Sequence, residues 1–125
     1  MYHILIVFVG GGIGAGLRYV FSVGALRLFG AGFPWGTLGI NVVGSLFMGA
    51  FVELSLRRFG GSQELRLFVA TGILGGFTTF SAFSLDFAQL FERGQMGAAA
   101  GYAIASVIFS ILAVFAGLWV ARYFA

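Results

Sequence analysis

The sequence has no cysteine and no lysine, a single proline and a single histidine, and four acidic residues. Without cysteine, the chain has no disulfide, no thiolate nucleophile and no sulfur ligand for a metal ion. His3 alone forms neither a metal cluster nor a serine–histidine pair, and no apolar segment holds a pair of aspartates. We therefore expect no enzymatic activity and no organic cofactor.

Charge is scarce as well, since Asp, Glu, Lys and Arg make up 9% of the residues. The seven basic residues are all arginines and give a net charge of +3. They are scattered singly, apart from the pair Arg57-Arg58, and form no basic tract. Nucleic-acid-binding proteins carry clustered basic residues, so we expect no nucleic-acid partner.

Apolar residues are what the sequence has in abundance: 60% of residues are hydrophobic, and the mean hydropathy is +1.04. A transmembrane helix needs about 20 apolar residues, so a chain of 125 residues holds at most about four or five crossings. We expect residues 1–125 to form a single transmembrane domain in the lipid bilayer. The first segment lacks the basic start of a signal peptide, so we expect it to be retained as a span.

Four apolar segments are separated by turn-forming or charged residues. They cover about residues 4–29, 37–56, 65–91 and 96–123. In the third, residues 75–81 place two glycines beside threonines and a serine, where a helix is weakest. We therefore expect an all-α membrane protein with four transmembrane helices, the third broken in mid-membrane, and both termini on one side.

Small residues four positions apart let membrane helices approach closely, because lipid gives no hydrophobic drive for helix association. Four sets have this spacing: Gly10/Gly14, Gly12/Gly16, Ser45/Gly49 and Gly97/Gly101/Ala105. We interpret them as sites of tight helix packing.

Two spans carry polar residues at the four-residue spacing that places side chains on one helical face. They are Thr37, Asn41 and Ser45 in the second span, and Tyr102, Ser106 and Ser110 in the fourth. Hydrogen bonding between helices explains the hydroxyl groups as well as a polar path does. Asn41 favours a water-filled path or a bound polar solute, because an amide at mid-span needs partners for two N–H donors and an acceptor.

The expected break lies next to a set of rings and hydroxyl groups. Phe80, Phe83 and Phe87 follow it at helical spacing, interleaved with Ser81 and Ser84. Packing alone explains any one ring, but ring edges and hydroxyl groups also suit a small anion. Carbonyl groups released at the break could bind a monovalent cation, and a simply kinked packing helix is the alternative.

Two charged residues lie inside the spans at a distance from the span ends. Arg18 is deep in the first span, where it needs a carbonyl group, a water-filled vestibule or an anion unless it snorkels to the interface. Asp86 follows the expected break and could pair with an arginine.

Three segments of the sequence resemble the Fluc (CrcB) family of fluoride channels, and the match extends over all four helices. They are Gly10-Gly11-Gly12-Ile13-Gly14-Ala15-Gly16-Leu17-Arg18-Tyr19, Gly36-Thr37-Leu38-Gly39-Ile40-Asn41-Val42-Val43-Gly44-Ser45 and Gly72-Ile73-Leu74-Gly75-Gly76-Phe77-Thr78-Thr79-Phe80-Ser81-Ala82-Phe83-Ser84. The run of Thr-Thr-Phe-Ser-x-Phe-Ser beside a double glycine is the most specific part. The sequence departs from the family pattern at Ala82, where threonine is usual, and at Asp86, where glutamate is usual.

The resemblance implies an antiparallel homodimer with two fluoride pores and a structural sodium ion at the dimer centre. It implies that Asn41, Phe80, Phe83 and Ser110 line each pore, with Thr37, Tyr102, Ser106 and Ser81 nearby. It also implies that backbone carbonyl groups of Gly75 and Thr78 hold the sodium ion. Arg18 and Asp86 are then expected at a vestibule or in a structural role.

The function predicted on this basis is a passive, fluoride-selective channel in the cell inner membrane, which exports cytoplasmic fluoride and so gives fluoride resistance. Two other classes of membrane protein share features with this sequence. A small multidrug exporter has the same size and four spans, but it needs an acidic residue in its first span, which this sequence lacks. A glycine-zipper assembly protein would leave Asn41 and the interrupted third span unexplained.

The arginines predict dual topology, because an excess of basic residues on one side normally fixes the orientation of a membrane protein. The face that holds both termini has Arg57, Arg58, Arg66 and Arg122. The other face has Arg27 and Arg93, and Arg18 adds to it only if its side chain snorkels outward. This bias is weak in so small a protein, so we expect both orientations to insert and to pair as an antiparallel homodimer.

Overall fold

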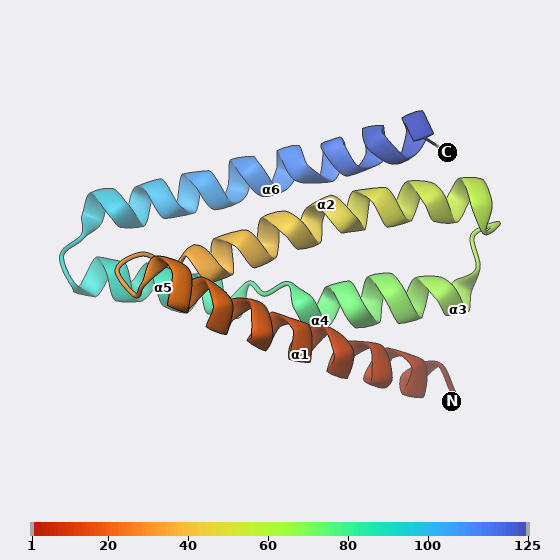
Figure 1. Cartoon of the computed structure of the whole chain (residues 1–125), viewed down its shortest axis with the longest axis horizontal. Helices are drawn as coiled ribbons and strands as arrows, with labels where there is room; N and C mark the ends of the chain where they lie inside the picture. Colours follow the sequence, from red (N-terminus) through yellow and green to blue (C-terminus); the bar gives the residue numbers. More distant parts are fainter. Residues whose placement is uncertain (1, 125) are drawn as a thin grey trace.

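The computed structural model describes residues 2–124 and is helical in each of four antiparallel spans (Figure 1). The first, second and fourth spans are single helices: α1 (Tyr2–Phe29), α2 (Trp35–Arg58) and α6 (Met96–Phe124). The third consists of α3 (Gln63–Arg66), η1 (Leu67–Leu74), α4 (Gly75–Phe77) and α5 (Ser81–Glu92). All four are long and apolar enough to cross a membrane, which confirms the predicted number of spans.

Short connections join the spans, and glycines in the left-handed backbone region occupy all three of them. Gly30 has a φ of 78°, Gly60 and Gly61 have φ values of 65° and 74°, and Gly94 has a φ of 78°. Glycine adopts this conformation at little cost because it has no Cβ atom. The tight turns return the chain each time, so the two ends of the described chain lie at the same end of the bundle (Figure 1).

The third span is interrupted at Thr78–Phe80, near the middle of the long axis of the bundle (Figure 1). This position lies inside the segment that the sequence marks as weak, but the double glycine is not the interruption. Gly75 and Gly76 belong to the helical turn α4, and the preceding eight residues form the wider π-helix η1. A Cβ atom on Gly76 would lie 2.5 Å from the carbonyl oxygen of Gly11, so Gly76 serves the close approach of α1.

Glycines set the distance between two pairs of helices. Cβ atoms added to Gly10 and Gly14 would clash with the backbone of η1 and α4, and one on Gly49 would clash with the backbone of α6. The packing predicted for these three glycines is therefore confirmed. Added Cβ atoms on Gly12, Gly16, Gly97 and Gly101 would meet no atom of residues 2–124 within 4 Å. The prediction is wrong for contacts within the chain at these positions, because they lie on outward faces of α1 and α6.

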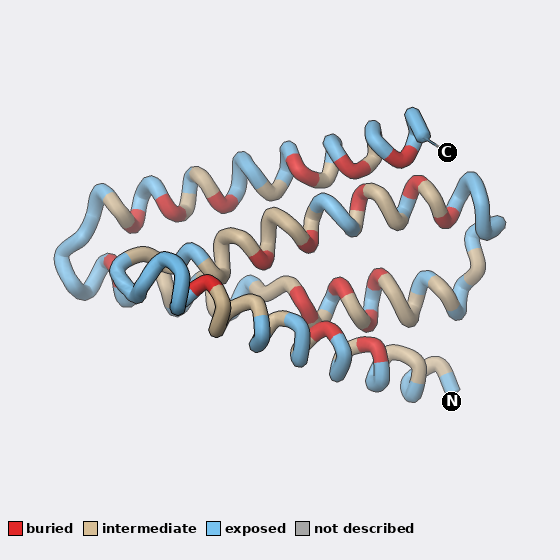
Figure 2. Tube along the Cα trace, viewed as in Figure 1, coloured by how far each residue is buried: buried red, intermediate tan, exposed pale blue. Residues whose placement is uncertain are grey.

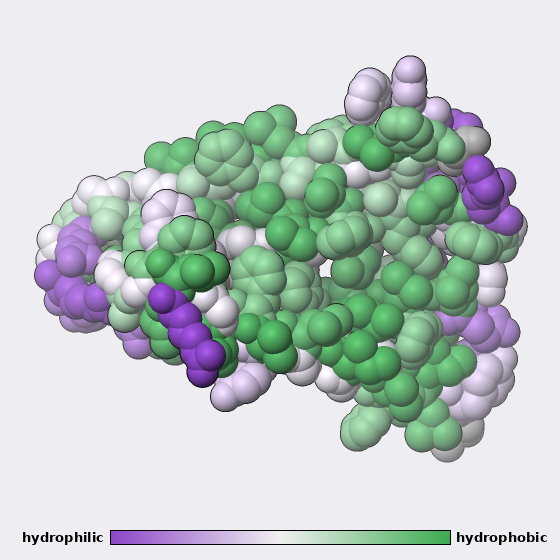
Figure 3. All heavy atoms as spheres, viewed as in Figure 1, coloured by the Kyte–Doolittle hydropathy of each residue, from purple (hydrophilic) through white to green (hydrophobic). Residues whose placement is uncertain are grey.

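Burial is confined to thin stripes where helices meet, and the outer faces are exposed along their length (Figure 2). Large apolar side chains dominate these faces: Leu28 is 80% exposed and Phe8 is 77% exposed. Figure 3 shows hydrophobic residues over the middle of the molecule and hydrophilic residues gathered toward its two ends. A surface of this kind is stable in contact with lipid, so the fold is that of a multi-pass membrane protein.

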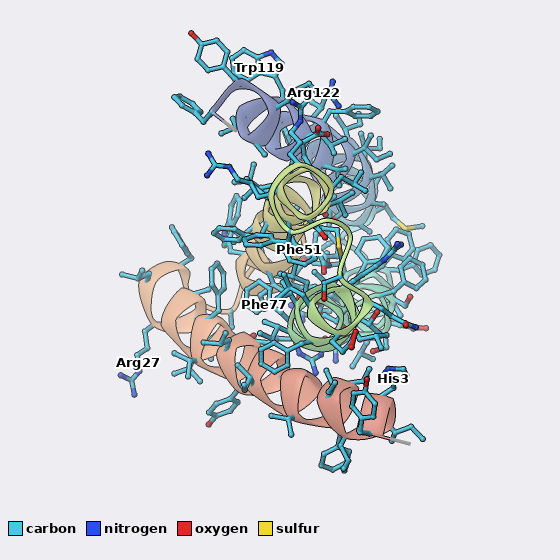
Figure 4. The ribbon with its side chains drawn as sticks, turned by 90° about the vertical axis from the view of Figure 1, so that its right-hand side faces the viewer. His3, Arg27, Phe51, Phe77, Trp119 and Arg122 are labelled. Atoms are coloured by element: carbon cyan, nitrogen blue, oxygen red, sulfur yellow. The ribbon has the colours of Figure 1, made fainter. Side chains whose placement is uncertain are left out.

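Side-chain contacts reinforce the packing of the spans. Glu53 on α2 accepts hydrogen bonds from Arg57 and, at 3.0 Å, from Nη2 of Arg122 on α6, which joins α2 to α6 near the C-terminus. Phe77 lies among the helices and meets the ring of Phe21 edge to face at 6.0 Å, whereas Arg27 points away from the bundle (Figure 4). The ion pairs of Glu53 therefore join α2 and α6 near the C-terminus, and the rings of Phe21 and Phe77 join α1 to the third span.

Gly14→Ala is expected to destabilise the protein, whereas Gly12→Ala on the same helix should be tolerated. The added methyl group at position 14 meets the carbonyl oxygen of Ile73 and the amide nitrogen of Phe77, which are backbone atoms and cannot rotate away. Overpacking of this kind costs about 1–3 kcal/mol. Thermal unfolding of the two purified variants measures the difference, and equal melting temperatures would contradict the packing assigned to Gly14.

Candidate functional site

A cavity of about 340 Å³, here called the central cavity, lies between α2, the break in the third span, α5 and α6. It gathers residues that the sequence had marked on three separate spans. Its lining consists of Asn41, Gly44, Ser45, Met48, Thr78, Thr79, Phe80, Phe83, Ser106, Val107, Ser110 and Val114. Of the eight residues expected along a pore, five share this cavity, and no side chain in its lining is charged.

Two serine hydroxyl groups on α6 are the unsatisfied polar groups of the central cavity. The Oγ atoms of Ser106 and Ser110 are buried, and neither has a hydrogen-bond partner within residues 2–124. The two residues are one helical turn apart and lie on the same face of α6. A buried hydroxyl without a partner costs about 1–3 kcal/mol, so these groups favour a polar occupant of the cavity.

Asn41 reaches from α2 to the interrupted backbone. Its Nδ2 atom donates to the carbonyl oxygen of Thr79 at 2.9 Å, and the amide nitrogen of Thr79 donates to Oδ1 of Asn41, also at 2.9 Å. This pair of bonds uses the amide oxygen and one of its two N–H groups, which leaves the second N–H free of these bonds. The sequence placed Asn41 in a polar path but did not reveal that it pairs with the backbone at the break.

Aromatic rings continue from the central cavity towards one end of the bundle. The rings of Phe80 and Phe83 lie 5.5 Å apart at 41°, and those of Phe83 and Tyr102 lie 5.1 Å apart at 38°. Phe80 is 77% exposed, so its ring borders both the cavity and the outer surface of the chain. Phe83 is partly buried and packs against the core that contains Tyr102.

Tyr102 lies between the central cavity and a second one. It is fully buried, and its hydroxyl group donates to Oδ2 of Asp86 at 3.1 Å. Asp86 and Thr37 line the second cavity, of about 330 Å³, with residues of the connection between α1 and α2. The prediction that Asp86 pairs with an arginine is wrong within residues 2–124, because Asp86 on α5 accepts a hydrogen bond from the hydroxyl group of Tyr102 on α6.

Ser81, Arg18 and Tyr102 are not among the residues that line either cavity. Ser81 begins α5, and its hydroxyl oxygen is 3.2 Å from Oγ1 of Thr79, on the exposed side of the break. Arg18 is partly exposed on α1, lines neither cavity and makes no ion pair or side-chain hydrogen bond with any residue from 2 to 124. A role for Arg18 at a vestibule stays a prediction.

Carbonyl groups at the break are released from the usual helical pattern. In a continuous helix, the amide groups of Thr79 and Ala82 would donate to the carbonyl oxygens of Gly75 and Thr78. Here the Thr79 amide donates to Asn41, and the Ala82 amide donates to Oγ1 of Thr79 at 3.1 Å. The carbonyl oxygens of Gly75 and Thr78 therefore lack their helical donors, which suits them as ligands for a hard monovalent cation.

Side chains provide no competing metal site in the part of the chain that the structure describes. Residues 2–124 contain no group of three or more His, Cys, Asp or Glu side chains that could hold a metal ion.

Comparison with known proteins places the chain among relatives that it matches over nearly its whole length. Residues 5–118 match the family model described as CrcB-like protein, Camphor Resistance (CrcB). The chain is 64% identical over 122 residues to a fluoride-specific ion channel, FluC, of Mesorhizobium japonicum. It is 57% and 55% identical over the same length to proteins of that name from Chelativorans sp. and Agrobacterium fabrum. Each alignment covers 98% of both chains.

Proposed function

The chain belongs to the CrcB family of fluoride-specific ion channels, and on that premise we propose that it is a passive fluoride channel that exports cytoplasmic fluoride and confers fluoride resistance. The observation that carries this proposal is the central cavity, in which two buried hydroxyl groups lack partners. Fluoride enters cells as neutral hydrofluoric acid and ionises inside, so an open path for the anion is enough to discharge it without any reaction step.

The lining of the central cavity suits fluoride because this ion is small and tightly hydrated. A selective path must replace its water with hydrogen-bond donors while remaining too narrow for larger anions. Ser106, Ser110 and the second N–H of Asn41 supply such donors. The electropositive ring edges of Phe80 and Phe83 supplement them. The absence of a cationic side chain in the lining keeps the ion from binding too tightly to leave.

We place the rest of the path through the second cavity. An ion would pass Thr37 and Tyr102 before it reaches the serines of the central cavity. Asp86 fixes the hydroxyl group of Tyr102, and Ser81 lies on the outer side of the break, next to Phe80. Arg18 lines neither cavity, so its proposed role is at a vestibule outside them, where it would draw anions towards the path.

The proposed assembly is an antiparallel homodimer in the inner membrane, with two pores and the broken third spans facing one another at mid-membrane. Phe80 and Gly75 are exposed on the surface of the single chain, and a second copy would cover them. The released carbonyl groups of Gly75 and Thr78 from both copies would then hold a structural sodium ion. Bound sodium would neutralise the carbonyl dipoles that the two breaks bring together.

Reconstituted protein is expected to release fluoride from liposomes and to leave chloride at the background rate of protein-free liposomes. No proton or sodium gradient should be needed, because a channel only lets the ion move down its own gradient. Ion-selective electrodes measure both anions in parallel preparations. Equal release of fluoride and chloride, or release that needs a coupled gradient, would contradict the proposal.

A further inference from the structure

The two hydrogen bonds between Asn41 and Thr79 determine which backbone groups at the break keep a helical partner. A continuous helix would use the Thr79 amide to satisfy the Gly75 carbonyl group. The Asn41 side chain removes that donor through the 2.9 Å bond to its Oδ1 atom, and it satisfies the Thr79 carbonyl through Nδ2 at the same distance. One side chain on α2 thus holds one residue of the third span outside the helix.

The side chain of Thr79 likewise takes a backbone amide away from its helical acceptor, further along the third span. Its Oγ1 atom accepts from the Ala82 amide at 3.1 Å, so the Thr78 carbonyl oxygen loses its helical donor. Upstream, the amide of Thr78 still donates to Leu74 at 3.0 Å, so the helix is intact until that point. Two specific side-chain bonds therefore account for the released carbonyl groups of Gly75 and Thr78. The carbonyl groups of Gly76 and Phe77 also lose their helical donors, because the backbone is extended at Thr78.

We propose that Asn41 is a positioning residue that holds Thr79 out of the helix and thereby keeps the Gly75 carbonyl free for a cation. Asn41 also lines the central cavity, so one amide serves the anion path and the cation site together. The claim that the Gly75 carbonyl binds a cation rests on the proposed function. The claim that Asn41 holds Thr79 out of the helix rests on the hydrogen bonds alone.

A side chain at position 41 must accept a hydrogen bond from the Thr79 amide and donate one to the Thr79 carbonyl, and asparagine does both. Leucine has the same branching and number of heavy atoms but no polar atom, so it would leave the Thr79 carbonyl unpaired and let the Thr79 amide return to the Gly75 carbonyl. Aspartate keeps the acceptor for the Thr79 amide, which is the bond that frees the Gly75 carbonyl, but it loses the donor to the Thr79 carbonyl and places a carboxylate beside the anion path. The two substitutions therefore separate the backbone role of Asn41 from its role in conduction.

Amide hydrogen exchange tests the backbone role. The Thr79 amide should exchange slowly in the wild-type dimer and in Asn41→Asp. In Asn41→Leu the amides from Thr79 to Ala82 should show a changed exchange rate, by about tenfold or more, while those of α1 and α6 stay unchanged. An exchange pattern around the break that is the same in all three proteins would overturn the proposal.

Sodium-dependent melting tests the link to the cation, because a bound ion raises the melting temperature of the state that binds it. The melting temperature of the wild-type dimer should be higher in sodium chloride than in N-methylglucamine chloride. Asn41→Leu should lose this difference, and Asn41→Asp should keep it while losing fluoride flux. Ser106→Ala is the matched control, which alters the anion path but not the break, and should keep the full sodium effect.

The outcomes separate the two proposals. A wild-type dimer that melts at the same temperature in both salts would remove sodium from the proposed function, and hydrogen exchange would still decide the role of Asn41. A sodium effect that persists in Asn41→Leu would show that the Gly75 carbonyl is free without the asparagine, and the inference would fail. If Asn41→Leu does not assemble, Thr79→Val tests the same principle, because it returns the Ala82 amide to the Thr78 carbonyl.

Discussion

Phe83→Ile is expected to lower fluoride flux by at least about tenfold, equivalent to about 1.4 kcal/mol on the transport barrier. The ring of Phe83 lies between Phe80 and Tyr102, at centroid distances of 5.5 Å and 5.1 Å, and lines the central cavity. Isoleucine preserves much of the volume but has no electropositive ring edge to face an anion. The effect should therefore fall on conduction more than on assembly.

Phe91→Ile provides the matched control for this experiment. Phe91 lies on the same helix, α5, but lines neither cavity, and its ring stacks on Phe87 at 6.5 Å. Fluoride release from liposomes and size-exclusion chromatography should be compared for both variants. Full flux in Phe83→Ile, with an intact dimer, would mean that the ring contributes only packing.

The spans were predictable because their signals are local in sequence. Apolar length, glycine and proline turns and paired charges mark each boundary, and the observed helices begin or end within a few residues of the expected positions. The location of the break was also predictable to within a short segment. The π-helix over Leu67–Leu74, in which Gly72 lies against Gly10 of α1, was not predicted from the sequence.

The candidate site was predictable in its residue types but not in its pairings. A four-residue spacing places Asn41, Ser106 and Ser110 on helical faces, yet it does not say what each face meets. The bond from Tyr102 to Asp86 and the bonds from Asn41 to Thr79 join residues of different spans, so only the fold reveals them. The same limit explains why Gly12 and Gly14 look alike in sequence although only Gly14 packs inside the chain.

Fixing the orientation of the protein is expected to abolish fluoride resistance, and co-expression of two oppositely fixed variants should restore it. The end of the bundle with both termini holds four arginines, and the other end holds two, apart from Arg18 within α1. So small a difference allows both orientations to insert. An antiparallel homodimer needs both orientations, so a population with only one of them could not assemble the proposed pore.

Two sets of substitutions fix the orientation in opposite ways, and both avoid the ion pairs that join Glu53 to Arg57 and Arg122. The first set is Arg27→Gln with Arg93→Gln. The second set is Arg58→Gln and Arg66→Gln with Gln95→Arg and Met96→Arg. A tag at the C-terminus, probed from each side of the membrane, should be accessible from both sides in the wild type and from one side in each variant.

Growth in fluoride then gives the functional result. Cells without the native channel that express either set alone should be sensitive, because every copy faces the same way, and cells that express both sets should regain resistance through mixed antiparallel dimers. The rescue excludes simple misfolding of the variants as the cause of the loss. Full resistance from one set alone, with the tag labelled from a single side, would show that parallel or single chains conduct. The antiparallel dimer and its shared cation would then have to be abandoned.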